Sequence, residues 1–528
     1  MTDPTASAYA RTGSENHYSY WSHPVKQVVV TGYSFEQPNS YATMSPTWTT
    51  LRDCYGGEGR VKSRGKIYLQ KFSAHSEDDY TSYLRRAYFY NAVRRTHTGL
   101  MGSLFRKPPE FTIPSAVKFD QTNITLDAES LRAFSKKIGF ELLLVGRYGV
   151  LADFKDSNAD EAYLTGYDAE NVYGWRQIVH KGRKITDRVV LIENEVTLTE
   201  YGSESVEIYR ILRLDPDPEF PGELRYSQEI VRPNAANIAG TPISTKIPYA
   251  AKGGRPLRYI PFVFFNPMDL LPDAKLPILY DIATMNLTHY TSTAQLEHGR
   301  FYAGMPTYVT SGDLSEHIPG IGSPNAPRTV GPSSIWELEK DAKAWLLEFT
   351  GHGLTFLENA VDSKQLQMQS LGGRLISSTR RAAALSDEAW QLLETGDEAT
   401  LLDVAEVLDE GLAQALSYLA HIRGDISDPE KSGIVAEFNK EFVRSELTAR
   451  ELRALQSLYE RGIIPLDVMY YALREVSVIP VEYSLEDFTA LMKKKDQIYE
   501  APPLPAPAGP GPGVRPPKKT LSLPKNGG

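Results

Sequence analysis

The pattern of hydrophobic and polar positions divides the chain into an α+β part and a mostly helical part. Between about residues 110 and 265, short runs rich in Val, Ile, Tyr and Phe alternate with turn residues, which is typical of strands in a largely antiparallel sheet. From Pro277 onward the hydrophobic positions recur at helical spacing. The pattern therefore predicts an α+β fold. The predicted strands are VYGWRQIV, DRVVLIENEV, SVEIYRILRL, ELRYSQEIV and YIPFVFF.

Two helices are predicted before and within the α+β part. Ser76 can cap a helix whose first turn carries three acidic residues, where the helix dipole favours anions, and Pro108 ends it. A second helix is predicted from Asp127 to about Gly146. Residues 1 to about 40 are polar and weakly periodic, so they are interpreted as an arm.

The segment from Leu276 to Gly312 contains a long helix with an unusual surface. Pro277 suits its first turn, where the missing N–H has no partner to lose. Its hydrophobic stripe follows the helical period, but the positions between are neutral, polar and mostly short, where a free surface helix would carry more Glu and Lys. Such residues suit close approach to neighbouring helices, so we expect this helix to be packed on both sides, against a copy of itself in a ring. The stripe is Leu279, Ala283, Leu287, Tyr290, Ala294, His298 and Phe301.

The rest of the second half is also predicted to be mainly helical. A helix is expected from about Leu354 to Ile376 and another from about Asp387 to Ile422, with Gly396 as a point where it can break. A helix, a Gly-containing turn and a further helix opened by Pro465 follow. The last 28 residues are rich in Pro and Gly and are expected to be disordered.

Composition limits the class of protein. The chain has 528 residues, 41% hydrophobic and 23% charged, which suggests about three or four domain-sized units. One cysteine, Cys54, allows no disulfide framework and no cysteine-based zinc cluster, which fits a reducing compartment. There is no apolar run of about 18 residues and no apolar core of a signal peptide, so no membrane span is expected. A net charge of −9 argues against a protein that binds nucleic acid over a broad surface.

The sequence carries no enzyme signature that predicts a catalytic residue, a metal or a cofactor. The nearest match to a P-loop, GEGRVKS, has Val61 where the second glycine must stand. His289 and His298 lie nine residues apart on different helical faces, so packed or interface histidines are favoured over a metal site. Neighbouring carboxylates are interpreted as helix caps and as solvent-exposed positions of helices, rather than as the acid/base pair of a glycosidase.

Three segments of the chain resemble a family of tailed-bacteriophage portal proteins. They are residues 57–111, residues 276–312 and the helix of residues 347–376, which ends in Leu-Gly-Gly-Arg-Leu. The resemblance covers roughly residues 50–425, and the helix–turn–helix around LYERGIIPLD is similar to portal crowns more loosely. It implies a dodecameric ring at one capsid vertex through which double-stranded DNA is packaged and ejected. It further implies a portal protein of the virion, made in the host cytoplasm.

The resemblance also implies a division into parts and a set of partners. The expected parts are an N-terminal arm (1–45), an α+β wing (46–274), a stem helix (275–300), a clip (301–345), a second stem helix (346–376), a channel loop (377–386), a long wing helix (387–424), a helical crown (425–500) and a disordered tail (501–528). The expected partners are the terminase large subunit, the head-tail adaptor and the major capsid protein, with no membrane.

Three residues are candidate sites in this interpretation. Trp336 in the clip is a candidate for docking the partner, and Arg380 and Arg381 are candidates for contacting DNA in the channel. The two arginines can equally belong to a helix and pair with nearby carboxylates. The alternatives for the whole chain are another virion adaptor or scaffold protein, or a virion-associated polysaccharide hydrolase.

Overall fold

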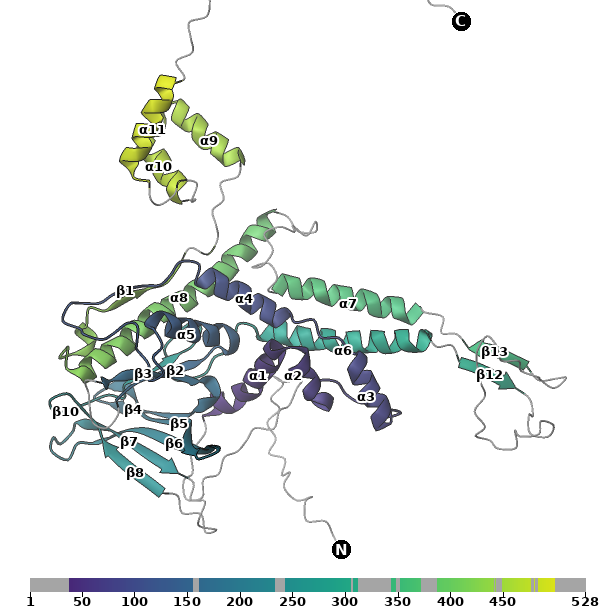
Figure 1. Ribbon diagram of the computed structural model, residues 1–528, viewed down its shortest axis with the longest axis horizontal. Helices are drawn as coiled ribbons and strands as arrows, with labels where there is room; N and C mark the ends of the chain where they lie inside the picture. The colour runs from purple at the N-terminus through teal and green to yellow at the C-terminus, as the bar shows by residue number, and fades with distance from the viewer. Residues whose placement is uncertain are drawn as a thin grey trace, which may run out of the picture. The chain divides into compact units, whose positions relative to one another are not determined.

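The computed structural model describes residues 38–154, 161–232, 243–304, 307–311, 343–347, 352–371, 387–440, 442, 449–475, 479 and 483–498. The chain forms two compact units that divide between Phe442 and Val443, and each is considered by itself (Figure 1). The first unit combines helices with antiparallel sheets, so the α+β class predicted from the sequence is confirmed.

The first helices differ from the predictions in their bounds. They are α1 (Asn39–Gly56), α2 (Glu58–Ser63), α3 (Glu77–Arg86), α4 (Ala92–Leu104) and α5 (Leu131–Val145). The arm expected to residue 45 is wrong at its end, because α1 begins at Asn39 and buries Tyr41 in the core. The second predicted helix begins at Leu131 rather than Asp127, since the Ser130 side chain accepts a hydrogen bond from the Ala133 N–H.

The single helix predicted from Ser76 to Pro108 is wrong, because the chain breaks it into α3 and α4. The predicted cap is present, since Ser76 and Asp79 form a reciprocal capping box at the start of α3. The chain leaves the helical conformation at Ala87, and Asn91 caps α4 by accepting a hydrogen bond from the Arg94 N–H. A cap in the middle of a continuous helical pattern creates a new N-terminus there.

Two antiparallel sheets form the β part of the first unit. The larger is a meander in the order β4-β5-β6-β7-β8, and the smaller has the order β11-β2-β3. The strands are β2 (Tyr148–Asp153), β3 (Tyr163–Asp168), β4 (Val172–His180), β5 (Arg183–Thr199), β6 (Gly202–Pro216), β7 (Leu224–Arg232), β8 (Ile243–Pro248) and β11 (Phe262–Phe265). Five of these, β4 to β7 and β11, were predicted from the sequence, and their antiparallel pairing is confirmed.

Shorter elements complete the first unit. Three two-stranded pairs are formed by β1 (Glu110–Thr112) with β14 (Val435–Glu437), β9 (Ala250–Ala251) with β10 (Arg255–Pro256), and β12 (Thr307–Ser311) with β13 (Lys343–Leu347). Single 3₁₀ turns are η1 (Gly65–Ile67), η3 (Ala169–Asn171) and η5 (Pro429–Lys431).

Helix α8 (Asp387–Arg423) packs its C-terminal half against the smaller sheet and α5. It runs through Gly396 without a break. Gly411 lets the helix approach the sheet, because a Cβ there would lie 2.3 Å from a ring carbon of Phe265. Its buried side chains include a stripe at helical spacing formed by Leu401, Val404, Leu408, Leu412, Leu416 and Leu419.

The helical crown expected from residue 425 is wrong at its start. Strand β14 pairs with β1, and the Phe438 N–H donates to the Asp409 carboxylate on α8 at 2.7 Å, so this segment belongs to the first unit. The described helices of the second unit are α9 (Ala449–Glu460), α10 (Leu466–Glu475) and α11 (Leu485–Ile498). The predicted glycine turn between two of them is confirmed, since Gly462 has φ of 71° and α10 follows Pro465.

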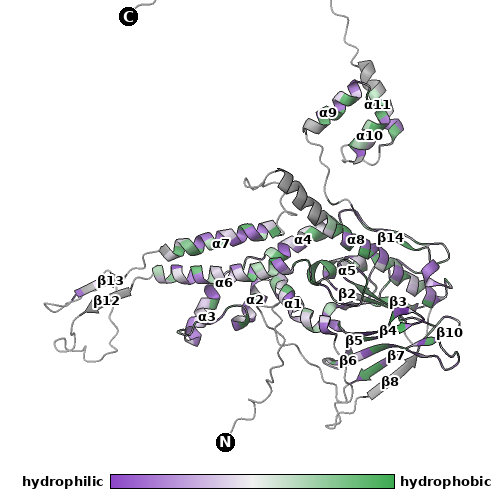
Figure 2. Ribbon diagram, turned by 180° about the vertical axis from the view of Figure 1, so that it is seen from behind, coloured by the Kyte–Doolittle hydropathy of each residue, from purple (hydrophilic) through white to green (hydrophobic). Residues whose placement is uncertain are grey.

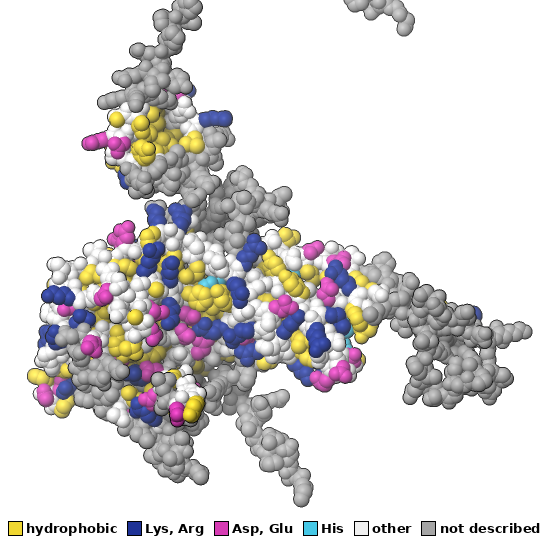
Figure 3. Space-filling model, in the orientation of Figure 1, with side chains coloured by type: hydrophobic (Ala, Val, Ile, Leu, Met, Phe, Trp, Pro, Cys, Tyr) yellow, Lys and Arg dark blue, Asp and Glu magenta, His cyan; other side chains and the backbone are white. Residues whose placement is uncertain are grey.

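Helices α6 (Tyr280–Ala303) and α7 (His352–Leu371) lie side by side in the first unit (Figures 1 and 2). The first stem helix, expected over 275–300, thus begins and ends later than predicted. The second, expected from 346, begins at His352 because β13 continues to Leu347. Many residues of α6 are pale in Figure 2, of intermediate hydropathy, as the neutral polar sequence predicts. Hydrophobic side chains lie on the surface over α7 (Figure 3).

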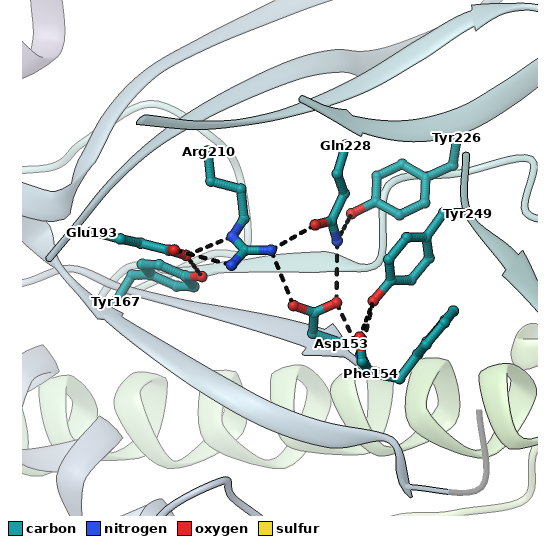
Figure 4. Close-up of polar contacts among 8 residues, drawn as sticks. All are labelled: Asp153, Phe154, Tyr167, Glu193, Arg210, Tyr226, Gln228 and Tyr249. Carbon is teal, nitrogen blue, oxygen red and sulfur yellow. Dashed lines mark hydrogen bonds and ion pairs between the residues drawn. The ribbon is translucent and has the colours of Figure 1, made fainter. Parts of the chain in front are cut away.

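A buried polar network joins the two sheets (Figure 4). Arg210 on β6 donates to both carboxylate oxygens of Glu193 at 2.6 and 3.0 Å, to Gln228 at 2.6 Å, and to Asp153 on β2 at 3.3 Å. The Asp153 carboxylate also accepts from the Gln228 amide and from the Phe154 N–H. Two carboxylates thus share one guanidinium, and burial raises the pKa of Asp153 above its ordinary value.

We expect the two charged ends of this network to respond unequally to substitution. Arg210→Met leaves two largely buried carboxylates without a cation and should lower the free energy of unfolding by about 3–5 kcal/mol. Asp153→Asn removes one buried charge and keeps the paired contact of Arg210 with Glu193, so its loss should stay near 1 kcal/mol. Urea unfolding of both variants checks this, and equal losses would contradict it.

Candidate assembly surface

Helix α6 has different neighbours on its two sides. His289 and His298 lie nine residues apart, which at 3.6 residues per turn places them on opposite faces. His298 contacts His75, ahead of α3, and Arg86 in α3, whereas His289 contacts Gln365 on α7. Helices α3 and α7 therefore flank α6 on opposite sides, as Figure 1 shows. Both histidines are packed side chains, as the sequence favoured.

The neutral polar side chains of α6 are satisfied inside the protein. Asn286 is buried and holds the α3–α4 break, since its amide donates to the Tyr90 carbonyl at 2.6 Å and accepts from the Ala92 N–H at 3.1 Å. The hydroxyls of Thr284, Thr288 and Thr293 donate to carbonyls one turn earlier in the helix. The helix is thus packed on two sides by its own chain, whereas the sequence predicted packing against a copy of the chain, and short polar residues make that close packing possible.

Helices α6 and α7 approach closely because small residues face the contact. A Cβ on Gly299 would lie 2.6 Å from a methyl carbon of Leu354, so only glycine leaves room for that leucine. Lys364 on α7 donates a hydrogen bond to the Ser292 hydroxyl on α6. The pair is held by apolar contact and by polar links across it.

The outer surface of α7 carries little charge and exposes large apolar side chains. Phe356 is 74% exposed and Leu366 is 61% exposed. Among the charged residues in the described part of α7, Asp362 is exposed, and Glu358 and Lys364 are partly exposed. The other exposed positions are neutral: Gly353, Thr355, Asn359, Ser363, Gln367, Gln369, Ser370 and Leu371. Large apolar groups in a neutral, polar setting are typical of a surface that binds another protein. We call this face of α7 the assembly surface.

A groove of about 420 Å³ lies between α6 and α7, with Tyr88 of the α3–α4 break on its wall. Arg300 in the groove pairs with Glu297 at 2.7 Å and with Glu358 on α7 at 2.8 Å. Asp362 also lines it. The groove is therefore a polar recess beside the assembly surface.

A chain of hydrogen bonds through two histidines attaches α3 to α6. Arginine cannot accept a hydrogen bond, so Nδ1 of His298 accepts from Arg86 at 3.2 Å. In the neutral ring Nε2 of His298 then carries the hydrogen and donates to Nε2 of His75 at 3.3 Å. The rings of Phe72, Tyr83 and Tyr302 surround the pair, and Arg86 lies 4.0 Å from the centre of the Phe301 ring. We call this arrangement the histidine relay.

The histidine relay favours the neutral ring of His298. Adding a proton to its acceptor nitrogen Nδ1 removes the hydrogen bond from Arg86 and places a positive charge beside that arginine. Burial, followed by the charge of Arg86, lowers the pKa of His298 below its ordinary value, although Asp79 opposes this. A lowered folded-state pKa stabilises the protein above the ordinary histidine pKa, and that stability is lost as the pH falls.

The residues predicted as sites from the sequence lie outside the described part of the chain. This applies to Trp336 and to Arg380 and Arg381, together with the expected channel loop and the Pro-rich tail. The sequence missed the histidine relay and the groove, because the relay joins residues 223 positions apart and no spacing pattern reports such a contact.

The described ranges contain no cluster of three or more His, Cys, Asp or Glu side chains able to hold a metal ion. No helix within them is long and apolar enough to cross a membrane.

The histidine relay should give the chain a pH-dependent stability. His298→Phe keeps an aromatic ring at this position and removes the titration. The difference in free energy of unfolding between wild type and this variant should shrink as the pH falls from about 7 to about 5. Urea unfolding across this range measures it. His97, His289 and His421 also have lowered pKa values and are present in both proteins. The test is therefore the difference in free energy of unfolding between wild type and variant, and not the pH dependence of the wild type alone. A constant difference would contradict the relay.

Comparison with known proteins gives a family match and a set of structural neighbours. Residues 278–422 match the model of a family described as a domain of unknown function, DUF4055. No curated protein matches the chain. One similar solved structure is the neck of a native gene transfer agent (GTA) particle computed with C12 symmetry, at 12% identity and a TM-score of 0.34, covering 74% of this chain and 92% of the other.

Two further structures come from the same kind of particle. The virion of a native GTA particle matches at 11% identity and a TM-score of 0.33, over 77% of this chain and 94% of the other. The neck of an empty GTA particle computed with C6 symmetry matches at 11% identity and a TM-score of 0.33, over 72% and 88%. At such TM-scores the likeness carries no weight for function. The structural neighbours are chains from GTA necks and virions.

Proposed function

We propose that this protein is a portal subunit, which forms a dodecameric ring at one vertex of a capsid. Double-stranded DNA passes through the ring during packaging and ejection. The ring has no catalytic residue of its own and serves as the docking site first for the terminase large subunit and then for the head-tail adaptor. The major capsid protein surrounds it in the virion.

The observation that carries this proposal is the assembly surface on α7. Phe356 and Leu366 expose large apolar side chains on a helix whose other exposed positions are nearly all neutral. Covering them with a copy of the chain removes apolar surface from water at about 25 cal/mol per Å². The sparse charge means that little desolvation cost opposes that burial. In a closed ring, one flank of each subunit contacts the opposite flank of the next subunit. The same contact is therefore repeated around the axis.

The portal parts map onto the described elements in a simple way. Helices α6 and α7 form the stem, and β12 and β13 belong to the clip that joins them, which carries Trp336 as the docking residue. The two sheets and α8 form the wing, and α9 to α11 form the crown. The net charge of −9 suits a DNA conduit, since each phosphate contact adds affinity that must be broken for DNA to move.

Ring formation should depend on the apolar residues of the assembly surface. Replacing Phe356 and Leu366 with Glu should abolish rings but leave the subunit folded, since exposed positions change stability by only about 0.5 kcal/mol. Val179→Glu on β4 is the matched control, because Val179 is 75% exposed and lies outside the assembly surface. Light scattering at micromolar concentration measures the mass. Rings formed by the double variant would show that the subunits contact each other through another surface. A monomeric wild type would overturn the portal function.

Arg380 and Arg381 should act on DNA rather than on assembly. As a loop in the channel they would hold phosphates weakly and reversibly, with a contact that weakens as salt rises. Changing both to Ala should leave rings intact and alter the packaging rate or the retention of packaged DNA. A packaging assay with salt titration measures this, and wild-type behaviour of the double variant would favour the helical, ion-paired interpretation.

A further inference from the structure

The groove between α6 and α7 has an excess of negative charge. Glu297, Glu358 and Asp362 line it, against the single cation Arg300. Arg300 is already engaged by the two glutamates, at 2.7 and 2.8 Å. Asp362 is exposed, and its electrostatic neighbour among the described residues is the ring of His289 rather than a Lys or Arg. The groove therefore has one carboxylate available for an incoming cation.

The walls of the groove suit a side chain that is both long and charged. Leu296 and Val361 supply apolar wall, and Tyr88, which is 54% exposed, lies beside them. An arginine buries its aliphatic stem against such walls and stacks its planar guanidinium on an aromatic face. Its fork of N–H donors also matches a carboxylate in geometry, which a lysine ammonium does not.

Helix α3, which lies on the other side of α6 from α7, carries an exposed arginine. Arg85 is the exposed cation of α3 and has no ion pair with any described residue. Tyr83 of α3 faces α6, where its ring lies 4.9 Å from that of His298. Arg85, two residues further along the helix, therefore points away from α6.

In the proposed ring, the flank of one subunit that carries α3 meets the flank of the next subunit that carries α7. Helices α3 and α7 flank α6 on opposite sides (Figure 1). A ring contact is heterologous, so one flank of each subunit meets the opposite flank of the next. We propose that the groove of one subunit receives Arg85 of the neighbouring subunit, which pairs with Asp362. This pairing rests on the proposed ring and names the ion pair that fixes the register of neighbouring subunits.

Charge reversal tests the pairing on the full-length chain. Asp362→Arg and Arg85→Glu each place like charges together, and each should raise the protein concentration needed for half-assembly by about tenfold or more. The double variant Asp362→Arg/Arg85→Glu restores opposite charges and should assemble near the wild-type concentration. Arg132→Glu, an exposed arginine on α5, is the control for the change in net charge and should assemble normally. Mass photometry counts the rings, and circular dichroism verifies that each variant is folded.

The outcomes separate this pairing from the proposed function. Loss of rings in both single variants with recovery in the double variant supports the pairing. Single variants that assemble like wild type overturn the pairing and leave the ring intact. Single variants that fail without recovery in the double variant overturn it too, because two independent defects would explain them. A wild-type chain that forms no ring overturns the proposed function and the pairing with it.

Discussion

The uneven burial of α6 is the constraint on which the first unit depends. Its N-terminal half lies in the core, where Ile282, Ala283 and Leu287 are buried among α1, α4 and the α3–α4 break. Its C-terminal half is covered by α3 on one side and α7 on the other. The Asn286 amide fixes the start of α4 from within this helix. The positions of α3, α4 and α7 are thus all set by contacts with one helix.

Charge is distributed differently in the sheets and in the α6–α7 pair. In the α+β part, carboxylates and guanidiniums form closed networks, as around Arg210, and the buried Asp53 accepts from Arg64 at 2.7 Å and from Tyr68 at 2.9 Å. Such networks fix one arrangement, because a partner removed leaves a buried charge behind. The outer face of α7 is instead nearly neutral. A charge-rich part therefore carries a helix pair whose surface is suited to burial.

The sequence was most informative where the pattern was local. The five predicted strands and the neutral helix follow from alternation and helical spacing, which depend on neighbouring residues. The split of α3 from α4 was missed because Ala87 and Asn91 sit inside a continuous helical pattern, and the contact that stabilises the break comes from Asn286. The start of the second unit was misplaced because β14 pairs with a strand more than 300 residues away. The histidine relay and the groove depend on similar distant contacts.

The single cysteine gives this chain an internal reporter. Cys54 lies in the last turn of α1, fully buried beside Asp53. Burial raises its pKa, so little of the reactive thiolate exists at neutral pH and reagents reach the sulfur only when α1 separates from the core. Because the sequence holds no second thiol, the rate at which a reagent modifies Cys54 measures a single event, the separation of α1 from the core. Transient exposure of the interior can thus be followed without introducing any foreign label.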